Sequence, residues 1–357
     1  MTLIPPTLRE SAILAAATAA WLLCGTPHAA FADDQNRALN NWRTTFLEEN
    51  DSLYFNSDKH YTQGLRFSAL SPEMSGRATD ALFGILGAIP GIFASDGGSE
   101  RRIALSVGQS LFTPKNLTLK PPDPTDRPYG GWLYGGASLL QEHGNQLENF
   151  EIQLGIVGPG ALGRETQNDF HQFIGDNQAQ GWSSQIQTEP GGLLSYERLW
   201  RLPLPLLSST SGGVENGIDF VPQGGVTGGN VFTYGEIGGT LRIGRHLETD
   251  YGQVRVRPGL SGTDYFNPDH LDDDVGFYVF AGAQGRAVAH NIFLDGNTAR
   301  PSPSVPREVL VADFQGGVSV FWSSRIRFDF SAVRRTIEFV GQHHPDVIGT
   351  AALATSW

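Results

Sequence analysis

Hydrophobic and polar residues alternate along many short segments of this chain, a pattern typical of β-strands with one apolar face. In the segment that begins at Arg325, the polar residues Arg325, Arg327 and Asp329 alternate with isoleucine and phenylalanine. Residues 275–287 place valine, phenylalanine and alanine on one side, and mainly glycine, tyrosine, glutamine and arginine on the other. A transmembrane β-barrel needs such strands, because each one faces lipid on one side and the interior on the other.

Twelve segments of this kind can be counted, and an even number is expected for a single-chain bacterial barrel. They cover residues 41–53, 60–72, 101–113, 129–142, 146–159, 190–203, 215–226, 230–244, 275–287, 307–321, 325–337 and 346–357. Turn signals rich in glycine, asparagine and serine separate several neighbours. The sequence therefore predicts an all-β fold, a transmembrane antiparallel barrel of about twelve strands. Ala81–Phe93, between the second and third strands, is expected to be a short periplasmic or interfacial insert.

The beginning of the chain has the features of a secretory signal. A basic residue precedes the apolar run Ala12–Cys24, and Ala30–Ala32 has the small residues of a cleavage site. We therefore predict a signal peptide over residues 1–32 and a barrel domain over residues 33–357. The apolar run is shorter than the ~20 residues that a transmembrane helix needs. Cys24 is the single cysteine, so the mature protein is expected to have no disulfides.

Composition supports a membrane barrel and narrows its partners. The chain has 44 Gly, 21 Phe, 9 Tyr and 7 Trp with only 39% hydrophobic residues, which fits a barrel with a polar interior. Its formal net charge of -12 provides no basic surface to neutralise phosphates, so no nucleic-acid partner is expected. We expect a monomer in the outer membrane of a Gram-negative bacterium.

The order of the strands brings several polar connections to one end of the barrel. If the mature chain starts in the periplasm, each connection from an odd to an even strand lies outside the cell. Asn50 and Asp51 end the first strand and Thr62 begins the second. Residues 115–126 join the third and fourth strands, and residues 159–190 join the fifth and sixth. All of them would reach the outer rim, beside the lipopolysaccharide of the outer leaflet.

The connection between the fifth and sixth strands contains a predicted short extracellular helix over residues 161–174. Its polar face carries Gln167, Asn168 and His171, and an amphipathic helix over the barrel wall should turn one such face toward that wall. Gly175 follows as a predicted helix stop.

The polar residues at this rim favour ester hydrolysis. A neutral imidazole at His171 can take a proton from water near neutral pH. Oxygen donors at Asn50, Asp51 and Asp176 could hold Ca²⁺, which would polarise an ester carbonyl. Taken singly, each residue is more typical of a turn, a strand or a helix. Their joint placement at one rim favours a site. Other polar loop residues are interpreted as solvated: His60, His343, His344 and the acidic run Asp272–Asp274.

A set of short motifs resembles the lipid A 3'-O-deacylase family of outer-membrane barrels. The resemblance follows the same order through nearly the whole mature chain. The motifs are Glu-Asn-Asp at 49–51, His-Tyr-Thr-Gln-Gly at 60–64, Gln-Ser-Leu-Phe-Thr-Pro at 109–114, Arg-Pro-Tyr-Gly-Gly-Trp-Leu-Tyr at 127–134, Gly-Pro-Gly-Ala-Leu-Gly at 158–163, Asn-Asp-Phe-His at 168–171 and Gly-Trp-Ser-Ser-Gln-Ile at 181–186.

The resemblance implies a twelve-stranded barrel with an active site between the outer wall and the extracellular helix. It implies release of the 3'-linked acyloxyacyl group of lipid A in lipopolysaccharide. It also implies calcium dependence, with the metal forming the oxyanion site and a histidine activating water, much as in secreted phospholipase A2. Matched by position, His171 is the base, Asn50 and Asp51 serve the metal site, and Thr62 completes the pocket.

The chain departs from the family pattern at two positions. A family glutamate, six residues after the histidine, falls on Asn177, with Asp176 one place earlier, so both are candidate metal ligands. A family lysine falls near Leu119, and a shift of the loop would bring Lys120 or Lys115 to its place.

Two other functions fit such a barrel. A passive pore or structural barrel would use Arg325, Arg327 and Asp329 to line its lumen. A serine-type lipid esterase or phospholipase needs an activated nucleophile, but the sequence has no Gly-x-Ser-x-Gly motif, and Ser183 and Ser184 have no evident histidine and acid partners. The metal-assisted deacylase ranks first.

Overall fold

The computed structural model describes residues 42–356 except 52–58, 90, 94–97, 205–208, 212–213, 257, 259–262, 268–270, 272–274 and 323–324. The predicted signal peptide and the acidic run Asp272–Asp274 lie outside the described residues. Residues Ala38–Trp357 form one compact unit.

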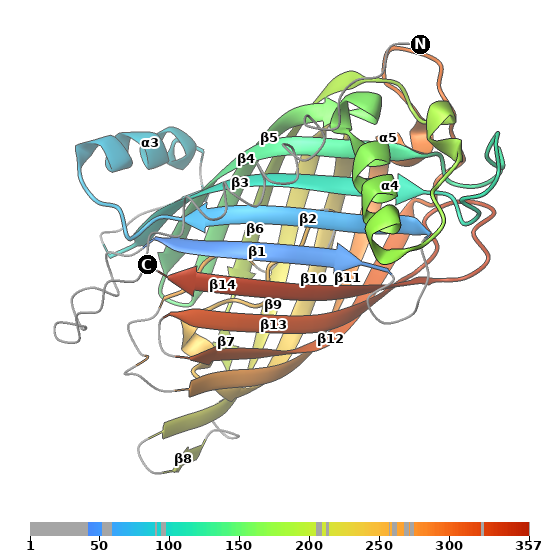
Figure 1. Ribbon diagram of the computed structural model, residues 1–357. Helices are drawn as coiled ribbons and strands as arrows, with labels where there is room; N and C mark the ends of the chain where they lie inside the picture. Colours follow the sequence, from blue (N-terminus) through green and yellow to red (C-terminus); the bar gives the residue numbers. More distant parts are fainter. Residues whose placement is uncertain are drawn as a thin grey trace. The chain divides into compact units, whose positions relative to one another are not determined.

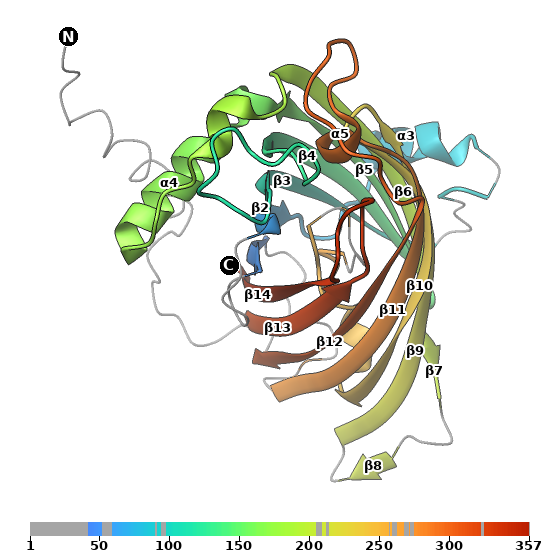
Figure 2. The same cartoon turned by 90° about the vertical axis from the view of Figure 1, so that its right-hand side faces the viewer.

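Twelve strands close into an antiparallel barrel (Figures 1 and 2). Neighbours in the sequence are neighbours in the sheet, β6 pairs with β9, and β14 pairs with β1 to close the ring. The strands of the ring are β1 (Arg43–Asn50), β2 (His60–Leu70), β3 (Glu100–Thr113), β4 (Gly130–His143), β5 (Gln146–Val157), β6 (Glu189–Trp200), β9 (Val214–Gly229), β10 (Phe232–Arg245), β11 (Val275–Asn291), β12 (Leu310–Trp322), β13 (Ile326–Arg335) and β14 (Asp346–Ser356). Each predicted segment overlaps one of them, so the predicted fold is confirmed. Two short strands, β7 (Leu202–Pro203) and β8 (Ser209–Ser211), pair with β9.

Alternation along the strands gives the barrel an apolar outer face and a polar inner face. On β13, Phe328 and Phe330 are exposed, whereas Arg327 and Asp329 are buried. The prediction that these two charged residues face the interior is confirmed. Arg325 precedes the strand and is exposed, so its predicted place in the lumen is wrong.

Helices occupy the connections between strands. The β2–β3 connection contains α3 (Arg77–Gly87), and the β5–β6 connection contains α4 (Gly163–Ile174), within the predicted helix of residues 161–174. Figure 1 shows α3 and α4 at opposite ends of the strands. The described part of the chain has no helix with both the length and the hydropathy of a membrane span. Shorter helices are η3 (Gly158–Ala161), η4 (Gly181–Ser184), η6 (Leu247–Thr249) and α5 (Ile292–Asp295).

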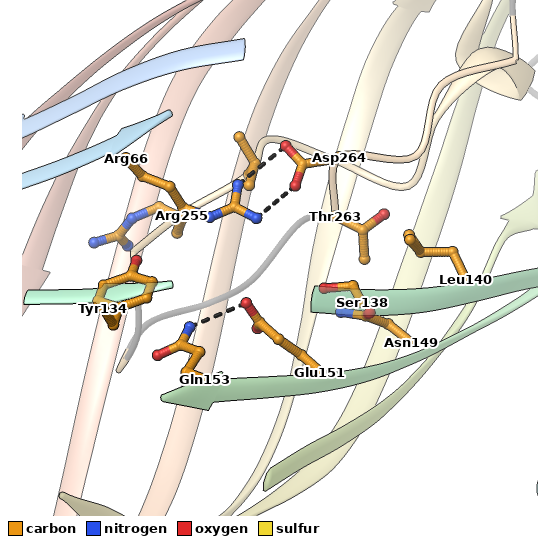
Figure 3. A pocket seen from close by; sticks show the side chains of 11 residues that line it. Arg66, Tyr134, Ser138, Leu140, Asn149, Glu151, Gln153, Arg255, Thr263 and Asp264 are labelled. Carbon is orange, nitrogen blue, oxygen red and sulfur yellow. Dashed lines mark hydrogen bonds and ion pairs between the residues drawn. The ribbon is translucent and has the colours of Figure 1, made fainter. Parts of the chain in front are cut away.

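The connection between β10 and β11 turns back into the barrel and pairs with its inner wall. Asp264 accepts two hydrogen bonds from the guanidinium of Arg66 on β2, at 3.0 and 2.6 Å (Figure 3). Arg255 forms an ion pair with Glu49 on β1. Asp250 accepts hydrogen bonds from arginines on β10 and β13. Because both partners of each pair are buried, the charges of the interior neutralise one another instead of lining an open channel.

A small pocket lies beside this inward segment. The pocket drawn in Figure 3, between the inner wall and the segment, has a cavity volume of about 20 Å³. That volume is room for about one water molecule. A passive pore needs an open lumen, and the buried ion pairs of the described inward segment occupy part of that space.

Candidate active site

At the α4 end of the barrel the outer wall is buried and polar, which reverses the pattern of the other outward positions. On β1, the outward residue Phe46 is 48% exposed, but the outward residue Asn50 is only 8% exposed. On β3, Val107 is exposed, but Thr113 at an equivalent outward position is fully buried. Outward residues lose their exposure only where other parts of the chain cover them. A cover therefore lies over this end of the wall.

The cover consists of α4 and the segments on either side of it. Figures 1 and 2 both place α4 outside the wall, beside the ends of β2 and β3. The helix begins in close contact with the wall, because a Cβ at Gly163 would lie 2.9 Å from Leu111 on β3 and 2.7 Å from Trp182. In the same region Gln109 Nε2 donates a hydrogen bond to the carbonyl of Ala161 at 2.6 Å. These contacts fix the start of α4 on the barrel.

Helix α4 buries its polar face and exposes its apolar residues. Gln167 and His171, one turn apart, are buried, and His171 is only 6% exposed. Phe170 and Phe173 are exposed, Phe173 to 87%. The helix ends at Gly175, whose φ of 80° lies in the left-handed region that favours glycine. The polar face predicted for this helix does turn toward the barrel wall.

A second layer of contacts holds this polar face. Trp182 Nε1 donates a hydrogen bond to Gln167 Oε1 at 2.7 Å, and its ring packs against Tyr129 with centroids 4.9 Å apart. Asn168 Oδ1 accepts the backbone N–H of Ala179 at 2.9 Å. The segment that follows α4 thus returns beneath it and fixes the rotation of the helix about its axis.

His171 is oriented through one of its ring nitrogens. Its Nδ1 lies 2.6 Å from the carbonyl oxygen of Asn177. A carbonyl oxygen only accepts hydrogen bonds, so Nδ1 is the donor in this contact. We predicted Asn177 as a ligand through its side chain, whereas the structure gives its carbonyl an orienting role. The left-handed turn at Gly175 brings that carbonyl back to the helix.

The other predicted ligand after the helix lies in the same turn. Asp176 is exposed, and its Oδ1 accepts the backbone N–H of Asn177 at 2.6 Å. In the part of the chain that the structure describes, no three His, Cys, Asp or Glu side chains form a group that could hold a metal. A cation at this rim would therefore need amide, hydroxyl or carbonyl oxygens beside the carboxylates.

Asn50 and Asp51 lie where β1 ends. Both are buried, and Asp51 Oδ2 accepts the backbone N–H of Lys59 at 2.6 Å. Asn50 shares the outward face of β1 with Glu48. The Glu48 carboxylate accepts hydrogen bonds from the side chains of Asn50 and of Gln63, the second at 3.5 Å. The predicted pair therefore supplies buried oxygen donors at the rim.

Thr62 lies in a β-bulge at the start of β2. The register between β2 and β3 shifts between Tyr61 and Gln63, and such a bulge sets two consecutive residues against one on the partner strand. Tyr61 packs in the interior, so the bulge turns Thr62 and Gln63 outward. Thr62 Oγ1 lies 2.6 Å from Oγ1 of Thr113, another outward residue. The bulge therefore brings a second hydroxyl to the covered wall.

The structure thus places the predicted residues at one end of the barrel. Asn50 and Thr62 belong to the outer wall, and His171 belongs to the helix that covers this wall. Sequence reasoning missed Gln109 and Thr113. The signal available for them was a polar residue in an outward position at the end of a membrane strand, where an apolar residue is the norm.

The prediction that His60 is a solvated loop residue is wrong. His60 is buried, with a positive φ of 64°. Its Nδ1 lies 2.8 Å from Asp346 Oδ2, and its Nε2 lies 3.4 Å from Asp126 Oδ1. These carboxylates come from the β3–β4 connection and the start of β14, so no local pattern around His60 indicates them. His343 and His344 are exposed, as predicted.

Asp126 is a charged group of the rim that lies outside the strands. Burial opposes its ionisation, but hydrogen bonds from His60 and from the backbone N–H groups of Lys115 and Arg127 hold its pKa below the ordinary 3.8. Both candidate lysines, Lys115 and Lys120, are exposed. Lys115 lines a hollow of about 160 Å³ beside His60.

Comparison with known proteins places this barrel in a family. A sequence profile described as outer membrane protein LpxR matches residues 14–357, which is most of the chain. The chain belongs to the LpxR family of outer-membrane proteins. This membership assigns the barrel to the outer membrane.

The LpxR fold is also found in a solved structure. LpxR from Salmonella typhimurium superposes with a TM-score of 0.67 at 19% identity, covering 88% of this chain and 99% of that one. The β domain of the Bordetella autotransporter BrkA covers 89% of this chain and 99% of its own, at 12% identity with a TM-score of 0.38. The first likeness supports the LpxR barrel fold, and the second is too distant to add to it. A search of curated proteins gives no match.

Proposed function

We propose that this protein is a lipid A 3'-O-deacylase, an ester hydrolase that releases the 3'-linked acyloxyacyl group of lipid A in the outer leaflet. The observation that carries the proposal is the hydrogen bond from His171 Nδ1 to the carbonyl of Asn177 at 2.6 Å. It keeps Nε2 as the proton-accepting nitrogen of a histidine held over the outer wall. Membership of the LpxR family supports lipid A as the substrate.

In this proposal, hydrolysis uses one water molecule for each ester. The water oxygen attacks the acyl carbonyl carbon while His171 Nε2 takes a proton from the water. The bond between the carbonyl carbon and the sugar oxygen then breaks, and the protonated imidazole gives its proton to that oxygen. The products are a carboxylic acid and a sugar hydroxyl. The carbonyl of Asn177 stabilises the imidazolium that forms between the two transfers.

Calcium is the cofactor in this proposal, and the residues at the end of β1 fit it. Ca²⁺ takes six to eight oxygen ligands, including carboxylates and amide carbonyls, and Asn50 and Asp51 present such oxygens at a buried rim. Asp176 and Asn177 are the candidate ligands from the α4 side. A bound Ca²⁺ would polarise the ester carbonyl and stabilise its developing negative charge.

The exposed face of α4 fits a lipid substrate. Leu162, Phe170 and Phe173 are exposed on the helix and its preceding turn. With the α4 end directed outward, these side chains would meet the acyl chains of the outer leaflet. An acyl ester would then approach the covered wall along its edge instead of through the filled barrel. Every residue of this proposal belongs to one barrel.

Mass spectrometry of lipid A from Gram-negative cells that make the protein tests the proposal. The expected result is lipid A lighter by a 3'-linked acyl or acyloxyacyl group, lost on calcium chelation and in the His171→Ala variant. A general base contributes about 10²–10⁴-fold to a rate, so mass spectrometry should detect no deacylated lipid A in cells that make the variant. Unchanged lipid A, with folded protein in the outer membrane and Ca²⁺ supplied, would refute the function. Full activity of His171→Ala would refute only the assignment of the base.

A further inference from the structure

Helix α3 lies at the end of the barrel opposite α4 (Figure 1). One side of the helix is fastened there. Phe83 is buried and lies edge-on to Phe93, with ring centroids 5.5 Å apart. Asp80 forms an ion pair of 2.7 Å with Arg101 on β3. The helix is therefore held to the barrel and does not hang from a loose loop.

The wall beneath this insert is polar. Glu148 occupies an outward position on β5, and its carboxylate accepts hydrogen bonds from the backbone N–H of Phe93 at 3.0 Å and from Arg198 on β6 at 2.6 Å. Tyr196, also outward on β6, donates to the same carboxylate at 2.5 Å. Covering these groups removes them from contact with lipid, where an unpaired polar group is costly. The insert thus separates a polar patch of wall from its surroundings.

The opposite side of α3 and its C-terminal turn is apolar and exposed. Ile85 is 71% exposed, and Leu82 and Ile89 are exposed beside it. With Ala78 and Ala88, these residues recur every three or four positions, so they form one stripe along the helix. Water is an unfavourable surrounding for such a stripe.

The position of α3 along the barrel axis indicates which surroundings contact the stripe. Trp42 precedes β1, Trp200 ends β6 and Trp322 ends β12, and in an antiparallel ring these three positions share the α3 end. All three are exposed on the outer face. Tryptophan gathers where the apolar core of a membrane meets water. On β3, the outward residues Leu105 and Val107 are exposed as well.

We propose that α3 is an interfacial helix whose apolar stripe inserts into a phospholipid leaflet at the end of the barrel opposite α4. The partner is a glycerophospholipid surface. It is recognised by burial of the stripe between acyl chains and headgroups, as in helices that lie in the membrane plane. With α4 outward, this surface is the periplasmic leaflet. The inference depends on the outer-membrane barrel and not on hydrolysis by the α4 site.

A nitroxide label on the stripe tests the proposal in the full chain. Ile85→Cys is labelled in a Cys24→Ser background, and the barrel is folded into vesicles of phosphatidylethanolamine and phosphatidylglycerol. The matched control is Gly84→Cys, one residue away, where an added Cβ meets nothing within 4 Å. Adjacent helical residues point about 100° apart. We expect the label at 85 to collide with oxygen several-fold more than with a water-soluble nickel chelate, and the label at 84 to show the reverse preference.

Equal access of the nickel chelate to both labels would overturn the proposal, because the stripe would then face water. Protection of position 85 in native membranes but not in pure phospholipid would also overturn it, by identifying a protein as the partner. If Ile85→Cys fails to fold, as judged by heat-modified mobility on gels, Ile89→Cys on the same stripe takes its place.

Discussion

Helices cover the outer wall at both ends of the barrel, but the polar residues beneath them are paired differently. Under α3, the buried carboxylate of Glu148 is neutralised by Arg198, and on α3 itself the exposed Asp80 pairs with Arg101. Under α4, His171 is held by a neutral carbonyl. The ion pair holds the wall to the insert through opposite charges, whereas the hydrogen bond to the carbonyl of Asn177 fixes the orientation of the His171 ring. The comparison separates a cover held by buried charges from one that orients an imidazole.

The largest expected difference between the two ends concerns activity. Asn50→Leu removes a candidate calcium ligand from the wall beneath α4 and should lower the deacylation rate about 100-fold, because a weakened metal site stabilises the developing oxyanion less. The matched control is Gln141→Leu beneath the α3 end, where Gln141 accepts a hydrogen bond from Arg101 at 2.9 Å. It should leave the rate of folded protein unchanged. Initial rates on purified lipid A at several calcium concentrations measure both.

A large loss of activity in Gln141→Leu, with the barrel still folded, would remove the distinction between the two ends. A normal rate in Asn50→Leu would exclude Asn50 from the site, whatever the role of His171.

The second expected effect is on stability and belongs to the α3 end. Arg198→Met leaves the carboxylate of Glu148 buried without its cation, which should lower the free energy of unfolding by about 3 kcal/mol. The double variant Arg198→Met with Glu148→Met should recover most of that loss, because no charge then remains buried. Urea unfolding in phospholipid vesicles measures the free energy. Equal losses in the single and double variants would mean that packing of the arginine stem, and not its charge, holds the insert.

The fold was predictable because it depends on local alternation. A membrane strand shows its two faces within about ten residues, so segments such as 325–337 and 275–287 identify themselves without any knowledge of their partners. Antiparallel order then follows where a short turn joins neighbours, as between β4 and β5 and between β9 and β10. Closure by β14 and β1 needs only an even count of strands.

The site was predictable only in part, because its contacts join distant segments. The polar face of α4 could be found from helical spacing, and Asn50 and Thr62 from their place at strand ends. His60 could not, since its partners Asp126 and Asp346 lie far away in the sequence. The inward turn of the β10–β11 connection has the same cause, because each of its ion pairs joins it to a different strand. The Asn177 carbonyl was missed because a backbone group leaves no mark in the sequence.

A smaller effect should follow from loosening α4. Gln167→Leu leaves Trp182 Nε1–H buried without its acceptor, which typically destabilises by about 1–3 kcal/mol. This loss should open α4 locally and leave the barrel intact. Hydrogen exchange measured by mass spectrometry should show faster exchange in residues 163–174 and unchanged exchange in α3. The control is Gln172→Leu on the exposed side of α4. Faster exchange at both ends would mean that the two covers are coupled.

The smallest expected effect is a dependence of the α4 rim on pH. Because the pKa of Asp126 is lowered in the folded state, its carboxylate contributes stability above the ordinary pKa of 3.8 and loses it as the pH falls through the folded value. Asp126→Asn should therefore melt lower than the wild type at neutral pH, by an amount equivalent to less than about 1 kcal/mol for a partly exposed group. The two melting curves should converge in acid, and Asp169→Asn, an exposed change of equal charge on α4, should show no such convergence. A difference that stays constant into acid would mean that Asp126 stabilises the rim through its shape and packing and not through its charge.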